Sequence, residues 1–228
     1  MTSAQLLRAS GLALLTGAVL FIVHIVARSA ITANAGGITV TFAKDGLWVP
    51  INALGVIGAV LVLVGMPAMY ARMAGSSGLL GVIGVLLIAL GWLFFGLFLS
   101  FYSMAVLPWL ATNTPLLVDG LNQHPPMLVA FSAALLAEVV GIVLFAIPFV
   151  RGRVHPRWVA YVLFASAVMT MGGIFIAPSG PATNVTINLL SNLGPVLLMI
   201  AIGALALRMW AKHAPTEQTQ LRVQPSPT

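Results

Sequence analysis

Apolar residues form six long runs along the chain, separated by short polar or proline-containing stretches. A bilayer core about 30 Å thick is crossed by about 20 apolar residues of helix, and each run fits that length. Helices are expected because backbone groups in lipid must be paired within their own segment. The pattern predicts an all-α integral membrane protein, a bundle of six transmembrane helices. The predicted spans are residues 11–27, 51–69, 79–99, 127–150, 158–177 and 189–207.

The overall composition agrees with this prediction. Sixty per cent of the 228 residues are apolar and 6% are charged, whereas soluble domains carry about 25% charged residues. This composition argues against a soluble enzyme, a disordered protein and a nucleic-acid binder, despite the net charge of +6. The sequence has no cysteine and no motif for a metal or a phosphate group, so we expect no metal site and no cofactor.

The basic residues are distributed unevenly between the predicted loops. Lysine and arginine favour the cytoplasmic side of membrane proteins, and eight of the ten fall on the side that holds both termini. We therefore expect a plasma-membrane protein, in a bacterial inner membrane, with both termini in the cytoplasm. The lipid bilayer is its expected partner, with anionic headgroups at the cytoplasmic face. The eight residues are Arg8, Arg72, Arg151, Arg153, Arg157, Arg208, Lys212 and Arg222.

The segments outside the spans complete the predicted organisation. Residues 1–10 form a cytoplasmic N-terminus, residues 11–210 form the transmembrane domain, and the polar residues 211–228 form a disordered cytoplasmic tail. An alternative is that the first run is a signal peptide cleaved after small residues, which would leave five spans. On the outer side, the alternating residues 38–42 favour a small hairpin or a surface segment. Residues 103–126 are predicted to form a loop over the outer mouth.

Glu138 is the acidic residue that the pattern places inside a span. An ionised side chain at the centre of a membrane helix costs roughly 2.5–3.5 kcal/mol on insertion scales, so we expect it to face other helices. The small residues Ala134 and Gly141 lie on its helix face and allow a neighbour to approach. Because a carboxyl group removed from water favours its neutral form, one interpretation is a proton or cation site. The alternative is a structural hydrogen bond between helices.

Three further polar residues lie at depths where they would meet Glu138. At 1.5 Å rise per residue, Glu138 and Thr170 both lie about 18 Å from the inner ends of their spans. His24 and Asn192 lie about 24 Å from the inner ends. A buried polar cluster of these four side chains is therefore predicted. For His24 the alternative is a side chain that bonds to a neighbouring carbonyl group.

Asparagines near the outer boundary extend this prediction. Asn184, Asn188 and Asn192 recur every four residues, so they would share one face if the sixth helix began early. Asn52 opens the second span. These residues are predicted to line an outer vestibule leading toward Glu138. The alternative is that asparagine caps helices and joins them to their neighbours.

The residues at depth favour a small permease, channel or transporter subunit with an intramembrane carboxyl site. One alternative is a membrane-embedded enzyme acting on a lipid or isoprenoid substrate, although the few acids and bases argue against catalysis and no catalytic residue is assigned. Another is a non-catalytic assembly or stress protein whose small-residue faces bind a second copy or a membrane partner subunit.

Overall fold

The computed structural model describes residues 3–118, 125–151, 157–176 and 183–211. The tail predicted to be disordered lies outside this part of the chain, apart from Ala211. The described residues are helical and contain no strand, which confirms the predicted all-α class. The helices are α1 (Ser3–Asn34), α2 (Thr39–Ala43), α3 (Trp48–Trp92), α4 (Leu99–Phe101), α5 (Leu107–Asn113), α6 (Pro115–Val118), α7 (Pro125–Arg151), α8 (Arg157–Ile176), α9 (Val185–Ser191) and α10 (Leu193–Ala211).

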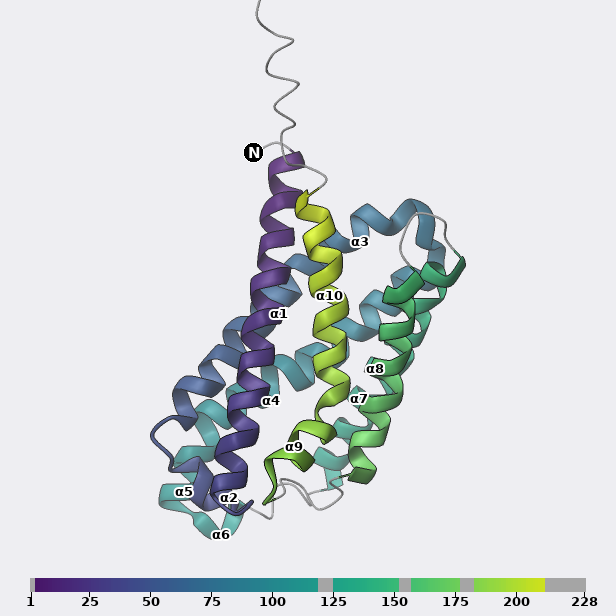
Figure 1. The fold of residues 1–228 in the computed structure, drawn as a ribbon. Helices are drawn as coiled ribbons and strands as arrows, with labels where there is room; N and C mark the ends of the chain where they lie inside the picture. Colours follow the sequence, from purple (N-terminus) through teal and green to yellow (C-terminus); the bar gives the residue numbers. More distant parts are fainter. Residues whose placement is uncertain (1–2, 119–124, 152–156, 177–182, 212–228) are drawn as a thin grey trace, which may run out of the picture.

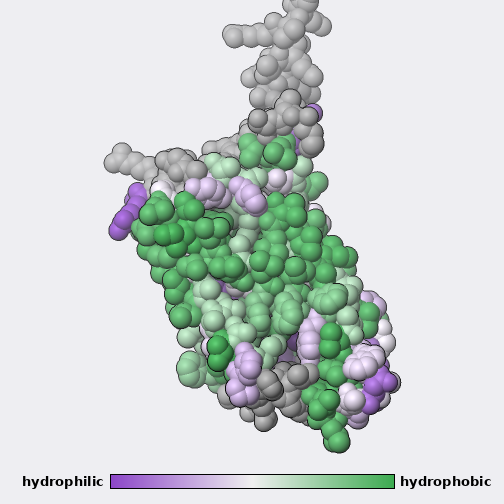
Figure 2. Space-filling view, turned by 180° about the vertical axis from the view of Figure 1, so that it is seen from behind, coloured by the Kyte–Doolittle hydropathy of each residue, from purple (hydrophilic) through white to green (hydrophobic). Residues whose placement is uncertain are grey.

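Six helical stretches in the described chain are long and apolar enough to cross a membrane. Each overlaps one of the predicted runs. Large apolar side chains point outward from them, and Val64 is 64% exposed and Phe175 is 80% exposed. On the face seen in Figure 2, a broad apolar band covers the middle, with most polar colours toward the two ends. The stretches are Gln5–Asn34, Trp48–Ala71, Gly78–Asn113, Pro125–Arg151, Arg157–Ile176 and Leu193–Trp210.

Helix α3 contains the second stretch and the first part of the third. The backbone remains helical through residues 72–77 and breaks at Gly78, which has φ +55° and ψ −162°. A positive φ is accessible to glycine at little cost because it has no Cβ atom. The second and third spans therefore join at one glycine, where the sequence predicted a short loop. In Figure 1 the blue ribbon of α3 reaches the end of the bundle near the N-terminus and then returns.

The third stretch is longer than predicted. It continues through two π-helical segments, η1 (Leu93–Phe98) and η2 (Tyr102–Val106), and through α5 to Asn113. The prediction that the span ends at residue 99 and that a loop begins at 103 was therefore wrong. Pro108 lies at the start of α5, directly after η2.

The short helices α2, α5 and α6 cover the end of the bundle away from the N-terminus, which we call the capped end (Figure 1). Of the two alternatives for residues 38–42, a hairpin or a surface segment, the hairpin was wrong, because residues 39–43 form α2. Phe42 and Trp48 are buried there with their ring centroids 4.7 Å apart. The indole Nε1 of Trp48 donates a hydrogen bond to the carbonyl oxygen of Ser103 at 2.8 Å. This bond joins the start of α3 to η2.

The long helices pack as a closed ring. Helix α1 contacts α3, α3 contacts α7, α7 contacts α8, α8 contacts α10, and α10 contacts α1. Glycines permit the closest approaches, since a Cβ atom on Gly84 of α3 would lie 2.6 Å from the backbone nitrogen of Phe145 in α7. A Cβ atom on Gly17 of α1 would lie 2.8 Å from the carbonyl oxygen of Gly58. The first, fourth, fifth and sixth spans thus belong to one ring.

Candidate functional site

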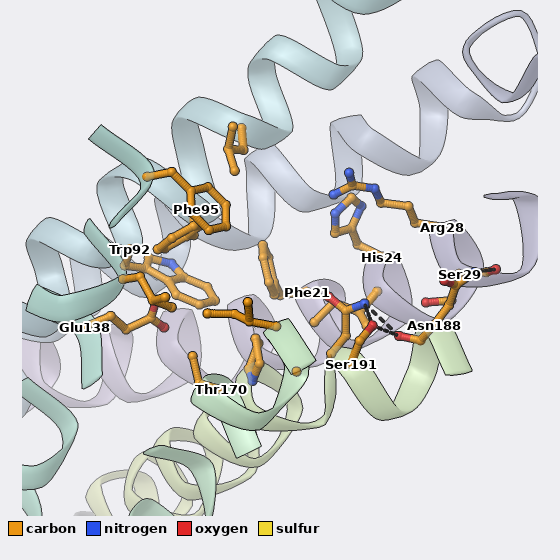
Figure 3. Close-up of a pocket in the computed structure, with 18 of the residues that line it drawn as sticks. Phe21, His24, Arg28, Ser29, Trp92, Phe95, Glu138, Thr170, Asn188 and Ser191 are labelled. Atoms are coloured by element: carbon orange, nitrogen blue, oxygen red, sulfur yellow. Dashed lines mark hydrogen bonds between the residues drawn. The ribbon is translucent and has the colours of Figure 1, made fainter. Parts of the chain in front are cut away.

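A cavity of about 470 Å³ lies among the helices in the half of the bundle nearer the capped end. Its size is within the range of about 300–1,000 Å³ typical of small-molecule sites. It combines aromatic walls with polar groups from several helices, as Figure 3 shows. The lining includes Phe21, His24, Arg28, Ser29 and Thr32 of α1, Trp92 and Phe95 of the third span, Phe131 and Glu138 of α7, Thr170 and Gly173 of α8, Asn188 and Ser191 of α9, and Asn192.

One end of the cavity holds Glu138. Its side chain is 2% exposed, and no hydrogen bond to its carboxyl group is present among the described residues. A Cβ atom on Gly91 would lie 2.5 Å from the Cβ atom of Glu138, so this glycine lets α7 approach α3 at the acid. Figure 3 shows Trp92 beside Glu138.

Two more polar groups near this end are buried without a partner. The indole Nε1 of Trp92 and the hydroxyl Oγ1 of Thr170 make no hydrogen bond in the described structure. An unpaired buried polar group costs about 1–3 kcal/mol. Both residues line the cavity, but these two atoms face glycines. A Cβ atom on Gly96 would lie 2.9 Å from Nε1 of Trp92, and a Cβ atom on Gly194 would meet Oγ1 of Thr170.

The other end of the cavity holds His24 and Arg28, one turn apart on α1. The ring Nδ1 of His24 lies 2.9 Å from the carbonyl oxygen of Ile51. A carbonyl oxygen can only accept, so Nδ1 carries the hydrogen and Nε2 is the acceptor of the neutral ring. A Cβ atom on Gly55 would lie 2.9 Å from Cγ of His24, so the absent side chain makes room for the imidazole.

Arg28 is half-buried and forms no salt bridge among the described residues. The carbon at the centre of its guanidinium group lies 5.6 Å from the centroid of the Trp48 ring. A cation over an indole face gains about 0.5–2 kcal/mol. This contact holds the guanidinium near His24 at the cavity (Figure 3). The cavity therefore has a cation at one end and a carboxyl group at the other.

Asn188 connects α9 to α1 next to this cationic end. Its Nδ2 donates to Oγ1 of Thr32 at 3.2 Å and to the carbonyl oxygen of Ser29 at 3.4 Å. The Nδ2 atom of Asn192 donates to the carbonyl oxygen of Asn188 at 2.7 Å. These bonds fix the short helix α9 across the mouth of the ring, between α1 and α8.

Five of the seven predicted site residues line the cavity, but at different places. Glu138 and Thr170 lie toward one end, and His24 and Asn188 toward the other, while Asn192 also contributes to the lining. Their functional roles stay predictions.

The remaining two predicted residues lie outside the cavity lining. The Nδ2 atom of Asn52 donates to the carbonyl oxygen of Trp48 at 2.8 Å, and the Oδ1 atom of Asn184 accepts from the backbone N–H of Thr186 at 2.8 Å, as a helix cap. The prediction of one continuous helix face through Asn184, Asn188 and Asn192 was wrong. Helix α9 ends at Ser191, and α10 begins at Leu193.

Sequence reasoning assigned no site role to Arg28 and Trp92. Arg28 follows the predicted first span and was counted only as one of the two basic residues on the side away from the termini. It lies one helical turn beyond His24, and this spacing is the signal that places both residues on the same helix face. Trp92 had no comparable signal, because a tryptophan in an apolar run is indistinguishable from a packing residue.

Comparison with known proteins found no matching family, no similar curated protein and no similar solved structure. Functional inference for this chain therefore rests on the cavity and its surroundings.

Proposed function

We propose that this chain is a multi-pass membrane protein that acts as a small permease or transporter subunit, with its solute bound in the cavity between the six spans. The observation that carries this proposal is the cavity itself. Polar side chains, among them His24, Arg28 and Glu138, line it inside a ring of helices whose outer surfaces are apolar. A polar cavity within a membrane bundle is the usual position of a solute site, because ionisable residues there are expensive unless they serve a pathway.

The charge distribution supports the orientation. In the fold, Arg8, Arg151, Arg157 and Arg208 belong to helix ends opposite the capped end. Lysine and arginine favour the cytoplasm, so we place that end in the cytoplasm of a plasma membrane, facing anionic headgroups. The cavity then lies in the outer half of the bilayer.

The same geometry disfavours the lipid- or isoprenoid-modifying enzyme. In that alternative Glu138 is a general acid, with His24 or an outer-loop residue as its partner, and the geometry tests the pairing with His24. The two side chains line opposite ends of the cavity, with Phe21 between them in Figure 3. A side chain that transfers a proton must lie within hydrogen-bonding distance of the reacting atoms. A single substrate bond cannot lie that close to both Glu138 and His24. Binding along the cavity is better supported than catalysis.

Single cysteines test the proposal, because the natural chain has none. Thr170 is 9% exposed and lines the cavity, whereas Val168 on the same helix is 64% exposed on the outer surface. We expect a membrane-impermeant thiol reagent to label Thr170→Cys in intact membranes much faster than Val168→Cys. The reason is that a thiol in lipid stays protonated, while one in a hydrated cavity reaches its reactive thiolate form.

Labelling from each side separates the outcomes. A permease exposes its site alternately, so Thr170→Cys should react in right-side-out and in inside-out vesicles. Faster labelling of Val168→Cys would overturn the membrane-embedded arrangement. Labelling of Thr170→Cys from the capped side alone would overturn the permease and leave a binding protein.

A further inference from the structure

The two ends of the cavity differ in charge, and this difference specifies a class of ligand. We infer that the cavity binds an elongated amphipathic zwitterion, with its acidic group at Arg28 and its ammonium group at Glu138. This inference rests on the proposed solute site and adds the chemistry of the solute.

The cationic end fits an acidic group. Arg28 has no carboxylate partner among the described residues, and its guanidinium group presents a fork of N–H donors that matches a carboxylate or a phosphate. The Trp48 ring beneath it restrains the side chain, so less freedom is lost when an anion binds. The neighbouring imidazole of His24 is held by its bond from Nδ1 to the carbonyl oxygen of Ile51, and Arg28 supplies the permanent positive charge at this end.

The opposite end fits an ammonium group. Glu138 lines this end of the cavity, and its carboxyl group accepts no hydrogen bond from the described residues. Aromatic faces attract cations through their quadrupole, and the rings of Trp92, Phe95 and Phe131 belong to the walls. An acid with an indole ring beside it (Figure 3) and further aromatic rings along the cavity walls can recognise an organic ammonium group.

The middle of the cavity sets the length and polarity of the ligand. Phe21 packs against Trp92 with ring centroids 4.4 Å apart, which places Phe21 near the acidic end. Arg28 follows Phe21 by seven positions on the continuous helix α1, a rise of about 10 Å. Phe21 lies between the two charged ends in Figure 3, so the connecting part of the ligand is apolar.

The test measures ligand binding to the full-length protein in neutral-lipid nanodiscs by calorimetry. The probes are 8-aminooctanoate, octanoate and octylamine, which share an apolar chain and differ in their charged ends. We expect 8-aminooctanoate to bind at least about tenfold more tightly than either single-charge probe, equivalent to about 1.4 kcal/mol. The shorter 4-aminobutanoate should bind more weakly, because it cannot reach both ends.

Charge-removing variants assign each end. In Arg28→Gln, the affinity for 8-aminooctanoate should fall to that for octylamine, and the affinity for octylamine should not change. In Glu138→Gln, the affinity for 8-aminooctanoate should fall to that for octanoate, and the affinity for octanoate should not change. Lys44→Gln is the matched control, since Lys44 is exposed at the capped end and does not line the cavity.

Equal affinity for the three eight-carbon probes would overturn the inference, as would variants that weaken all probes alike. Neither result depends on transport. If Thr170→Cys is labelled from one side only but the protein still prefers the zwitterion, the permease proposal alone is overturned. If labelling occurs from both sides but the zwitterion is not preferred, the ligand class alone is overturned.

Discussion

Replacing Gly84 with alanine is expected to lower the unfolding temperature by about 6–12 °C, which corresponds to about 3 kcal/mol for a chain of this size. The added Cβ atom would lie 2.6 Å from the backbone nitrogen of Phe145 and 3.0 Å from the carbonyl oxygen of Gly141. Backbone atoms cannot rotate away as a side chain can, so α3 and α7 must separate. The separation would also disturb the position of Glu138, one turn before Gly141 on α7.

Gly172→Ala is the matched control for that measurement. No atom lies within 4 Å of a Cβ atom built on Gly172, and alanine is favoured over glycine within a helix by about 1 kcal/mol. This variant should therefore be as stable as the wild type or slightly more stable. Thermal unfolding of both variants in the same nanodiscs makes the comparison. Equal stability of the two variants would contradict the close α3–α7 crossing.

Replacing Trp48 with alanine is expected to cost about 3–5 kcal/mol, the range for removing a large aromatic side chain from a core. The Trp48 side chain is fully buried, packs against the tilted ring of Phe42 and donates to the backbone of Ser103. Its loss removes the contact between the start of α3 and η2, together with the hydrogen bond that the Ser103 carbonyl accepts from the indole. The short helices of the capped end should then detach before the long helices unfold.

Trp109→Ala is the control for this second variant, because Trp109 also lies near the capped end but is 60% exposed. Thermal unfolding measures the stability, and limited proteolysis follows the short helices. We expect rapid cleavage within residues 93–118 in Trp48→Ala and slow cleavage in Trp109→Ala. Similar cleavage in both variants would show that Trp48 does not hold the capped end together.

The six long helices could be predicted from the sequence because lipid imposes a simple requirement. A segment such as residues 127–150 must be apolar and helical along its whole length, and both properties are visible in the residue pattern. The ends of the helices were less predictable. The π-helical continuation beyond Leu99 depends on how η2 packs against Trp48. The local pattern of apolar residues cannot predict this contact, because Trp48 is distant in the sequence.

The candidate site shows the same division. Glu138 and Thr170 could be selected from polarity and depth alone, because polar groups inside a span are rare. Asn184 and Asn52 were grouped with them by position, but the amide of Asn184 caps α9 at Thr186 and the amide of Asn52 bonds to the carbonyl oxygen of Trp48. Arg28 was missed because α1 continues to Asn34, beyond its apolar run, and so carries the arginine into the bundle.

The unfolding temperature of Glu138→Gln, compared with the wild type in the same neutral-lipid nanodiscs without ligand, tests most directly whether Glu138 serves the cavity or the fold. Glutamine keeps the size of the side chain and removes its charge, and no hydrogen bond to the carboxyl group is present in the described structure to be lost. We expect the variant to unfold within about 2 °C of the wild type or at a higher temperature. A decrease of several degrees would show that the carboxyl group is a structural tie between helices, contrary to its role as a ligand-binding group.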